Sequence, residues 1–544
     1  MSSTGNDRLV AAIDQGTSST RCVLFNNIGE VVASHQKNVN IISHRSGWAE
    51  HDPLNTLSTV KECMQMVMNG RSRMEIACVG VTNQRETVVV WDKTTGQPLY
   101  NAILWLDDRT TGICTRLSRH VDGINRFRHI CGLPISSYFS ATKLIWLIEN
   151  VDSVRTAVNN GNCFVGTMDS WIIWNLTGGP TKGVHITDVT NASRTMLMDI
   201  RTLRWSSETC SQMGIPESCL PNIVSNSEIV GHVDAGTALD GVPISGCLGD
   251  QHAAMIGQLC FEKGSVKTTY GTGAFMLLNT GSNIVVSQHG LLSTITAKLG
   301  PNEPVVYALE GSIAYAGALV NWLRDNFGLL TNAADISTLA GSVEDNGGVY
   351  FVPAFGGLFA PHWSDSARGI IIGLSQHTEK GHIARAALES ICFSVKEVLA
   401  AMEIDSKCAI KTLRVDGGMT SSDTLMQMQA EVLRSRIERP NMLEATALGA
   451  AIAAGLSVGY WSSISDVKQK CQFAYSSFEP QLTSGGNYDE AFYQYQRAIK
   501  RSIGWLEDTA HKGESSINWG WAMLGTLSVG SAMIGAIIMR YISK

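Results

Sequence analysis

The chain has 544 residues, of which 44% are hydrophobic and 17% are charged. This length exceeds one ordinary domain and suits two domains of roughly 250 residues each, and the hydrophobic content excludes an intrinsically disordered chain. With 42 Lys and Arg against 48 Asp and Glu, the net charge is −6. That charge disfavours a nucleic-acid partner, because such partners need a strongly basic surface.

The first predicted elements form a β-meander. Residues 9–35 contain three short apolar segments separated by polar turns, which is typical of strands joined by hairpins. A helix is predicted next, because Asp52 suits the N-cap, Pro53 suits the first turn and apolar residues then recur at helical spacing. An alternating α/β pattern continues with predicted strands at 76–81 and 87–91 and a predicted helix at 143–150.

A second unit of the same kind is predicted at residues 265–279, where a Gly- and Thr-rich turn again separates two apolar segments. A later predicted strand, 412–416, runs into a Gly-rich turn and then into a helix that continues through Gln427. We expect a domain boundary near Gly257 and a cleft between the domains, which is a common place for a ligand.

The 13 cysteines are scattered along the chain, and no two have Cys-x-x-Cys spacing. This pattern predicts buried, reduced thiols in a reducing compartment, and neither a disulfide framework nor a zinc knuckle. Residues 1–8 are polar, so we expect no secretory signal and a cytosolic main body.

Three turns have the composition of phosphate-binding loops. The turn after the first predicted strand combines Asp14, Gly16 and small hydroxyl residues. The glycine allows close backbone approach, N–H and O–H groups can donate to phosphate oxygens, and the carboxylate can hold hydrated Mg²⁺. An ordinary polar hairpin explains this turn alone equally well. The turns at 270–273 and 416–418 favour a split two-domain ATPase, and no GxxxxGK[ST] loop is present.

Polar residues gather at the ends of two further predicted strands, at 83–86 and 249–252. Arg85 can donate to hydroxyl groups, Glu86 can accept from them, and Asp250 can take a hydroxyl proton during phosphate transfer. A structural ion pair between Arg85 and Glu86 is the alternative. Adjacent residues of a strand face opposite sides, which disfavours such a local pair.

These residues carry a family resemblance. The segments 13–21, 83–87, 138–140, 249–252, 270–273 and 415–419, in this order, resemble the glycerol kinases of the FGGY carbohydrate kinase family. The resemblance spans residues 10 to about 505, and residues 138–150 and 373–389 match the two signature stretches of that family. It implies an α/β fold of the actin-like ATPase type, with two ribonuclease-H-like domains and a cleft between them.

The resemblance also implies an activity and a domain organisation. The expected reaction is direct in-line phosphorylation of glycerol to sn-glycerol 3-phosphate, with ATP and Mg²⁺, which feeds glycerol into glycerolipid and carbohydrate metabolism. We expect an N-terminal domain at 1–257 for glycerol and phosphate and a C-terminal domain at 258–507 for the nucleotide. The expected partners are glycerol, ATP and further copies of the chain in a dimer or tetramer.

The site residues implied by the resemblance fall into three groups. Asp250 matches the general base. The glycerol contacts are Arg85, Glu86, Tyr138, Asp250 and Gln251, with Trp105 and Phe275 as an apolar wall. The ATP contacts are Thr17, Ser18, Arg21, Thr272, Gly317 and Gly418, and Asp14 and Asp250 lie near the metal, through water.

Four positions depart from the family pattern: His252, Asn321, His362 and Ser422. A charged His252 would lower the pKa of the neighbouring Asp250 and slow proton removal, whereas a neutral one would act only as a hydrogen-bonding neighbour. Two alternative functions therefore remain. One is a kinase for another small polyol or sugar, and the other is a catalytically impaired, membrane-docked paralogue, although retention of Arg85, Glu86 and Asp250 disfavours the latter.

The composition changes towards the end of the chain. Residues 515–539 carry no charged side chain, and Arg540 and Lys544 follow them. About 20 apolar residues suffice to cross a bilayer, so within a linker and anchor at 508–544 we expect a transmembrane helix at about 518–539. The expected location is the mitochondrial outer membrane with the catalytic body in the cytoplasm. The endoplasmic reticulum membrane, the cytoplasm, and a buried terminal helix are the alternatives.

Overall fold

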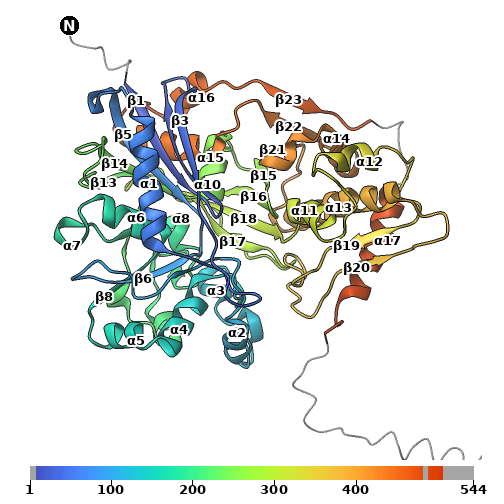
Figure 1. The fold of residues 1–544 in the computed structure, drawn as a ribbon, viewed down its shortest axis with the longest axis horizontal. Helices are drawn as coiled ribbons and strands as arrows, with labels where there is room; N and C mark the ends of the chain where they lie inside the picture. Colours follow the sequence, from blue (N-terminus) through green and yellow to red (C-terminus); the bar gives the residue numbers. More distant parts are fainter. Residues whose placement is uncertain (1–7, 482–487, 507–544) are drawn as a thin grey trace, which may run out of the picture.

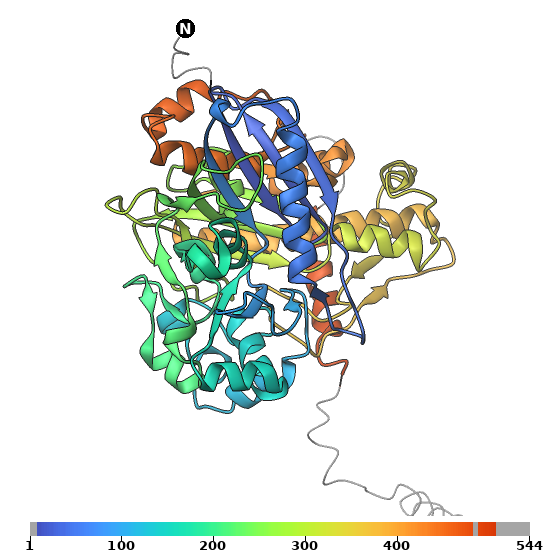
Figure 2. The same cartoon turned by 60° about the vertical axis from the view of Figure 1, so that its left-hand side comes forward.

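The computed structural model describes residues 8–481 and 488–506 (Figure 1). The predicted membrane helix at about 518–539 lies outside these described residues. Among the helices of the described part, none is both long and apolar enough to cross a membrane. The described chain is built around two large β-sheets, each with helices packed on it (Figures 1 and 2).

The first sheet contains the predicted meander. Its strand order is β13 (Ser227–His232), β14 (Pro243–Gly249), β5 (Ile76–Asn83), β1 (Leu9–Gln15), β2 (Ser19–Phe25) and β3 (Val31–Asn38). Strands β1, β2 and β3 pair antiparallel, whereas β1 and β14 pair parallel with β5. The carboxyl ends of β1, β5 and β14 therefore meet at one edge, which brings the turn after β1 close to the polar residues that follow β5 and β14.

The second sheet repeats this arrangement. Its strand order is β17 (Leu292–Ala297), β18 (Val306–Ile313), β16 (Ala274–Gly281), β15 (Val266–Tyr270), β21 (Thr412–Asp416), β22 (Arg436–Pro440) and β23 (Tyr475–Phe478). Strands β15, β16 and β18 pair antiparallel, and β15 pairs parallel with β21. The order β21-β15-β16-β18 thus corresponds to β5-β1-β2-β3, which confirms the predicted repeat.

Helices cover the sheets, and the first of them begins where the sequence predicts. The side chain of Asp52 accepts a hydrogen bond from the backbone N–H of Leu54 and caps α1 (Pro53–Val67), as predicted. The other helices of eight or more residues are α4 (Ser140–Asn150), α5 (Asp152–Asn159), α6 (Met168–Leu176), α10 (Asp250–Gly257), α11 (Gly317–Asp325), α13 (Lys380–Ser406), α14 (Asp423–Leu433), α15 (Ala445–Ser457) and α17 (Tyr488–Ser502).

Shorter elements complete the described chain. The strands are β4 (Glu50–His51), β6 (Val88–Asp92), β7 (Ala102–Ile103), β8 (Cys163–Thr167), β9 (Ile186–Asp188), β10 (Met198–Asp199), β11 (Arg204–Trp205), β12 (Asn222–Val224), β19 (Tyr350–Val352) and β20 (Ile370–Ile372). The shorter α-helices are α2 (Thr111–Leu117), α3 (Arg128–Cys131), α7 (Gly179–Lys182), α8 (Val189–Ala192), α9 (Ser207–Met213), α12 (Asp335–Ala340) and α16 (Ile464–Lys470).

Helix α15 returns the chain to the first sheet. It follows β22 of the second sheet, yet its alanines pack in one core with Val10, Cys78 and Leu248 of the first sheet. The crossing with α10 is tight, because a Cβ placed on Gly449 would lie 1.8 Å from the carbonyl oxygen of Ala253. After α15, Trp461 donates to the carbonyl oxygen of Asn27 at 2.9 Å. Figure 2 shows these late helices beside the first strands of the chain. The predicted domain boundary near Gly257 stays a prediction.

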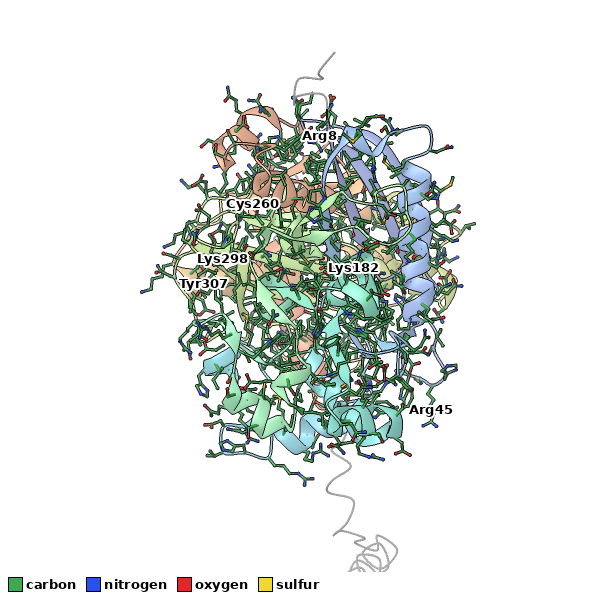
Figure 3. All side chains as sticks on the ribbon, turned by 90° about the vertical axis from the view of Figure 1, so that its left-hand side faces the viewer. Arg8, Arg45, Lys182, Cys260, Lys298 and Tyr307 are labelled. Atoms are coloured by element: carbon green, nitrogen blue, oxygen red, sulfur yellow. The ribbon has the colours of Figure 1, made fainter. Side chains whose placement is uncertain are left out.

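Side chains fill the space between these layers. All 13 cysteines are free and eleven are buried, as the scattered spacing predicts. Strands β17 and β18 pair through Ala297 and Val306. Because the two strands run antiparallel, the same register places Ile295 opposite Tyr307, which is labelled in Figure 3.

Candidate active site

A cavity of about 150 Å³ lies where the two sheets meet. It is lined from the first half of the chain by Thr17, Arg85, Glu86, Trp105, Tyr138, Asp250 and Gln251, and from the second half by Thr269, Gly271, Thr272 and Phe275. All seven residues predicted to contact the polyol are in this lining, as are Thr17 and Thr272 of the predicted nucleotide set. Residues up to 258 positions apart in the chain thus face one space.

Arg85 and Glu86 face this cavity together because they lie beyond the end of β5. Strand β5 ends at Asn83, and Glu86 has φ 62°, a left-handed conformation that breaks the alternation of a strand. Arg85 Nε lies 3.9 Å from Glu86 Oε1. The argument that strand alternation separates the two side chains is therefore wrong at this position.

Two charged residues that sequence reasoning missed complete the surroundings of this pair. Glu310, on β18, accepts from both terminal nitrogens of Arg85, at 2.7 and 2.8 Å. Arg194, which follows α8, donates from Nε to Glu86 at 2.6 Å. A carboxylate within the otherwise uncharged strand Val306–Ile313 is a signal that could have drawn attention to Glu310, because such a group is rarely buried unless paired.

Asp250 has the surroundings of a proton acceptor. It is the first residue of α10, its Oδ1 accepts from the backbone N–H of Gln251 at 2.7 Å, and Arg85 Nε lies 3.3 Å away. Removal from water raises the pKa of Asp250, while Arg85 opposes that shift. The side chain remains 28% exposed, so a substrate hydroxyl in the cavity can reach it.

Gln251 is oriented by a buried lysine that was also missed. Lys267 Nζ donates to Gln251 Oε1 at 2.5 Å and to Thr269 Oγ1 at 2.8 Å. Burial lowers the pKa of Lys267 to about 8, and Asp416 counteracts part of this shift. Because an ammonium group can only donate, it holds the amide oxygen of Gln251 and leaves the amide nitrogen for another partner.

An aromatic wall closes the other side of the cavity. The Trp105 ring lies 5.7 Å from both Tyr138 and Phe275, edge to face in each case. Trp105 also donates from Nε1 to Thr17 Oγ1 at 2.9 Å, which connects this wall to the turn after β1. Burial raises the pKa of Tyr138, so its hydroxyl stays protonated and can donate a hydrogen bond.

A second cavity, of about 680 Å³, adjoins the first, because Thr269 lines both. Arg21 and Gly418, two predicted nucleotide contacts, are in its lining, and Arg21 Nη1 lies 3.1 Å from Glu444 Oε2. The remaining two predicted nucleotide contacts, Ser18 and Gly317, line neither cavity. Ser18 is exposed, and Gly317 donates its N–H to the carbonyl oxygen of Gly271 at 2.9 Å.

Asp14 lies at the end of β1 and supplies a second carboxylate. Removal from water raises the pKa of Asp14 to about 7; Arg21 opposes the shift, and Asp250 and Glu444 add to it. Asp14 and Asp250 thus repel each other electrostatically. Paired carboxylate oxygens are the hard donors that Mg²⁺ prefers, and a divalent cation would relieve their repulsion, so this donor set fits the metal that the sequence predicts.

The four departures from the family pattern have structural explanations or lie apart from the cavities. His252 is fully buried, and burial together with nearby cations holds its pKa well below the usual range, which favours the neutral of the two forms considered for His252. Ser422 caps α14 by accepting from the N–H of Leu425 at 3.1 Å. His362 pairs with Glu397 at 2.9 Å, and Asn321 is exposed on α11.

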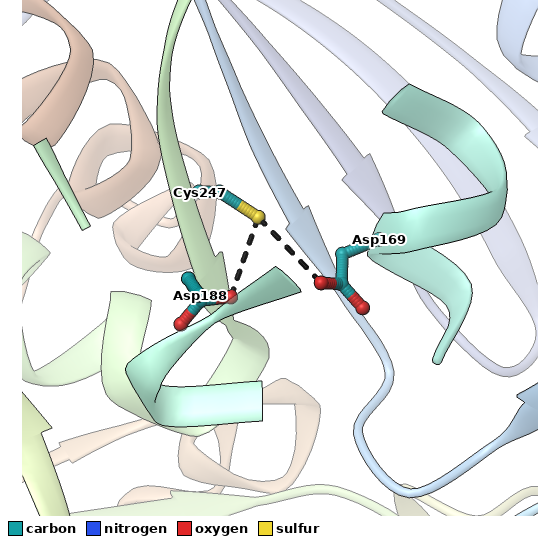
Figure 4. A group of neighbouring side chains, drawn as sticks. All are labelled: Asp169, Asp188 and Cys247. Atoms are coloured by element: carbon teal, nitrogen blue, oxygen red, sulfur yellow. Dashed lines mark hydrogen bonds between the residues drawn. The ribbon is translucent and has the colours of Figure 1, made fainter. Parts of the chain in front are cut away.

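A buried polar network holds the ends of β5 and β14 in place. Asn83 and Asn191 exchange two side-chain hydrogen bonds, and Thr190 Oγ1 accepts from the N–H of Gly249 at 2.9 Å. Asp188, which caps α8, accepts from Thr190 and Asn191. Figure 4 shows Cys247 between Asp188 and Asp169, at 3.3 and 4.0 Å. One hydrogen-bond network therefore holds both strand ends, after which Arg85 and Asp250 follow.

Comparisons with known proteins agree with this geometry. The N-terminal domain of the FGGY family of carbohydrate kinases matches residues 9–257, and its C-terminal domain matches residues 266–458. Glycerol kinases of Brucella anthropi and Arabidopsis thaliana are each 50% identical, covering 92% and 88% of this chain and 100% and 94% of their own.

Solved structures show the same fold. The crystal structure of Plasmodium falciparum glycerol kinase with ADP has a TM-score of 0.82 at 37% identity, covering 91% of this chain and 98% of that one. A ligand-bound xylulose kinase from Lactobacillus acidophilus has a TM-score of 0.80 at 22% identity, over 91% and 98% of the two chains.

Proposed function

The chain belongs to the FGGY family of carbohydrate kinases, and from this premise we propose that it transfers the terminal phosphoryl group of ATP to glycerol, forming sn-glycerol 3-phosphate. The observation that carries the proposal is the 150 Å³ cavity in which all seven predicted polyol contacts meet. Relatives that are 50% identical over almost their whole length are glycerol kinases, which supports this substrate over other polyols.

The lining of the cavity matches the chemistry of a small triol. Arg85 and the amide nitrogen of Gln251 can donate hydrogen bonds to hydroxyl oxygens, and Glu86 can accept hydrogen bonds from hydroxyl groups. The wall of Trp105 and Phe275 can cover the carbon backbone of the substrate. A site that pairs each hydroxyl rejects analogues that lack one, because a buried polar group then loses its partner.

Phosphoryl transfer follows from the position of Asp250. A substrate hydroxyl beside Asp250 gives its proton to the carboxylate while its oxygen forms a bond to the terminal phosphorus of ATP. The bond from that phosphorus to the leaving oxygen of ADP breaks in the same in-line step, and the proton then passes to solvent. Thr17 and Thr272, at the edge of the same cavity, offer hydroxyl donors to the phosphate oxygens.

Asp14 and Asp250 would hold Mg²⁺, through water, beside the phosphates. When bound, the ion supplies positive charge that offsets the negative charge of the phosphate oxygens. The Gly-rich turn at 416–418 and Arg21, which line the larger cavity, would accommodate the rest of the nucleotide.

The reaction is tested by ADP release from the full chain with glycerol and MgATP. We expect glycerol-dependent turnover, and a fall in kcat of about 100- to 10,000-fold in Asp250→Asn, the range for loss of a positioned general base. Asp234→Asn, which alters an exposed partner of Lys182, is the matched control and should behave as wild type.

The same assay distinguishes the alternatives. Faster turnover of erythritol or a pentulose than of glycerol would show a kinase for another polyol or sugar. Absence of turnover with any of them in the folded wild-type chain would favour the impaired paralogue.

We further propose that residues 515–539 attach the protein to a membrane, most simply the mitochondrial outer membrane with the kinase body in the cytoplasm. The support is the uncharged run itself, with Trp519 and Trp521 suited to the lipid interface and Arg540 and Lys544 after it. Alkaline carbonate extraction tests attachment, and complete release would contradict it. A reporter fused to residues 513–544 tests the organelle, with the endoplasmic reticulum and the cytoplasm as the competing outcomes.

Assembly into a dimer or tetramer is also proposed, on the family resemblance. Light scattering on detergent-solubilised protein measures the mass directly, and a monomeric mass would contradict this proposal.

A further inference from the structure

Four buried charged side chains form a closed ring behind the polyol cavity. Glu310 Oε2 lies 2.7 Å from Arg85 Nη1 and 3.1 Å from Arg194 Nη1. Glu86 Oε1 lies 2.6 Å from Arg194 Nε and 3.9 Å from Arg85 Nε. Each arginine thus contacts both glutamates, and each of the four side chains is at most 2% exposed.

The ring joins the two halves of the chain. Arg85 and Glu86 follow β5, and Arg194 follows α8, whereas Glu310 lies in β18 of the second sheet, 225 residues from Arg85. Two of the four residues, Arg85 and Glu86, also line the cavity, but Arg194 and Glu310 do not. The latter two therefore act on a substrate through their partners.

Glu310 determines how Arg85 is presented. A bidentate pair fixes the plane of a guanidinium group as well as its position. With both terminal nitrogens held by Glu310, Arg85 keeps Nε towards Asp250, at 3.3 Å. Without Glu310, Arg85 has only the longer contacts to Asp250 and Glu86, and its long side chain has other rotamers available.

Arg194 supports the other members of the cavity lining. Its guanidinium carbon lies 5.7 Å from the centre of the Tyr138 ring and 5.3 Å from that of Phe139, distances at which a cation is attracted to an aromatic face. The same side chain holds the carboxylate of Glu86. One residue thus fixes a polar contact and the aromatic wall together.

We propose that Glu310 and Arg194 are positioning residues, which hold Arg85, Glu86 and Tyr138 in the arrangement that binds the polyol. The proposal rests on the proposed function, since it assigns these two residues to the substrate side of that reaction. The ring contains two positive and two negative charges, so it is neutral as a whole. Loss of one member leaves an uncompensated buried charge.

The central test is the nearly isosteric substitution Glu310→Gln in the full chain. It removes the charge and one of the two acceptors for Arg85 while keeping the volume. We expect KM for glycerol to rise about 10- to 100-fold, the range for a lost hydrogen bond to a charged group, with KM for ATP within about two-fold of wild type. A purely structural role would lower the melting temperature without this split between the two substrates.

Glu389→Gln is the matched control. Glu389 is also buried, at 3% exposure, and accepts from Arg385 at 3.0 Å and Asn346 at 2.7 Å, but it lines neither of the two cavities. It should lower the melting temperature and leave both KM values unchanged. An equal rise in KM for glycerol in this control would overturn the proposal, because the effect would then be one of general destabilisation.

A second variant covers the case in which Glu310→Gln does not fold. The double variant Arg194→Met/Glu310→Gln removes one charge of each sign and leaves Arg85 and Glu86 as an oppositely charged pair. We expect the same rise in KM for glycerol. A glycerol KM within two-fold of wild type in either folded variant overturns the proposal.

Calorimetric titration with glycerol gives a dissociation constant without turnover, and it should weaken in parallel with KM. If wild-type protein neither binds nor phosphorylates glycerol, the proposed function fails, and the same variants are compared with the polyol that the substrate panel identifies. An unchanged dissociation constant for that polyol would then overturn the positioning role itself.

Discussion

Gln251 presents a defined donor to the polyol cavity because Lys267 fixes its amide. The ammonium group holds Oε1 of Gln251 at 2.5 Å, and an amide held by its oxygen offers its NH₂ group elsewhere. Folding lowers the pKa of Lys267 to about 8 through burial, so below that pH the charged amine lowers the stability of the folded state. Lys267 therefore costs stability while it orients a predicted substrate contact.

Replacing this lysine by methionine tests the orientation. Lys267→Met should raise KM for glycerol about 10-fold, because the amide of Gln251 loses its fixed partner. It should change the free energy of unfolding little, because the variant no longer buries a charged amine. Steady-state kinetics and a melting curve measure the two effects. Lys298→Met is the control, since that amine contacts backbone carbonyls of a remote loop.

The pH dependence has a definite sign. In wild type, Lys267 loses its charge as the pH rises through about 8, so its hydrogen bond to Gln251 weakens and KM for glycerol should rise above that pH. The rise should be absent in Lys267→Met. A parallel rise in both proteins would assign the effect to another group.

Local elements could be read from the sequence, whereas several contacts of the site could not. The β1-β2-β3 meander, the Asp52 cap of α1 and the strand at 412–416 depend on periodicity and capping within a few residues, which the sequence displays directly. Glu310, Arg194 and Lys267 contact residues of the cavity lining only through the tertiary packing of distant segments. Arg85 and Glu86 were identified, but their common orientation depends on one left-handed residue beyond a strand end.

The crossing of α10 and α15 can be tested with one added methyl group. A Cβ at Gly449 would lie 1.8 Å from the carbonyl oxygen of Ala253, so Gly449→Ala should separate the two helices and destabilise the fold by about 3 kcal/mol or more. Chemical denaturation measures the change. Gly112→Ala, in α2 with open space around the added carbon, should instead be neutral or slightly stabilising, and equal effects would contradict the packing argument.

At the scale of the whole molecule, the two sheets are joined by shared cores. Helix α15 packs on the first sheet although the chain reaches it from the second, and the ionic ring links β5 to β18. Separate unfolding of the halves would break both connections. We therefore expect the two halves of the described chain, with the cavities between them, to unfold as one cooperative unit.

We accordingly expect one thermal unfolding transition, shifted upwards by glycerol together with a non-hydrolysable ATP analogue. Each ligand binds only the folded chain, and a free ligand concentration of 100 times the dissociation constant raises the free energy of unfolding by roughly 2.7 kcal/mol. Differential scanning calorimetry measures this on the solubilised full chain. Two transitions that respond to the two ligands independently would contradict a single unit.

The return of α15 to the first sheet also bears on how the protein is made. A ribosome releases the strands β1, β5 and β14 within the first 249 residues, but the helix that covers their apolar face lies at Ala445–Ser457. Val10, Cys78 and Leu248 therefore stay without their final cover until more than four fifths of the chain has been synthesised. The first sheet therefore cannot be completed from its own half of the chain, and nascent chains that stall before residue 445 expose an apolar surface of the kind that molecular chaperones bind.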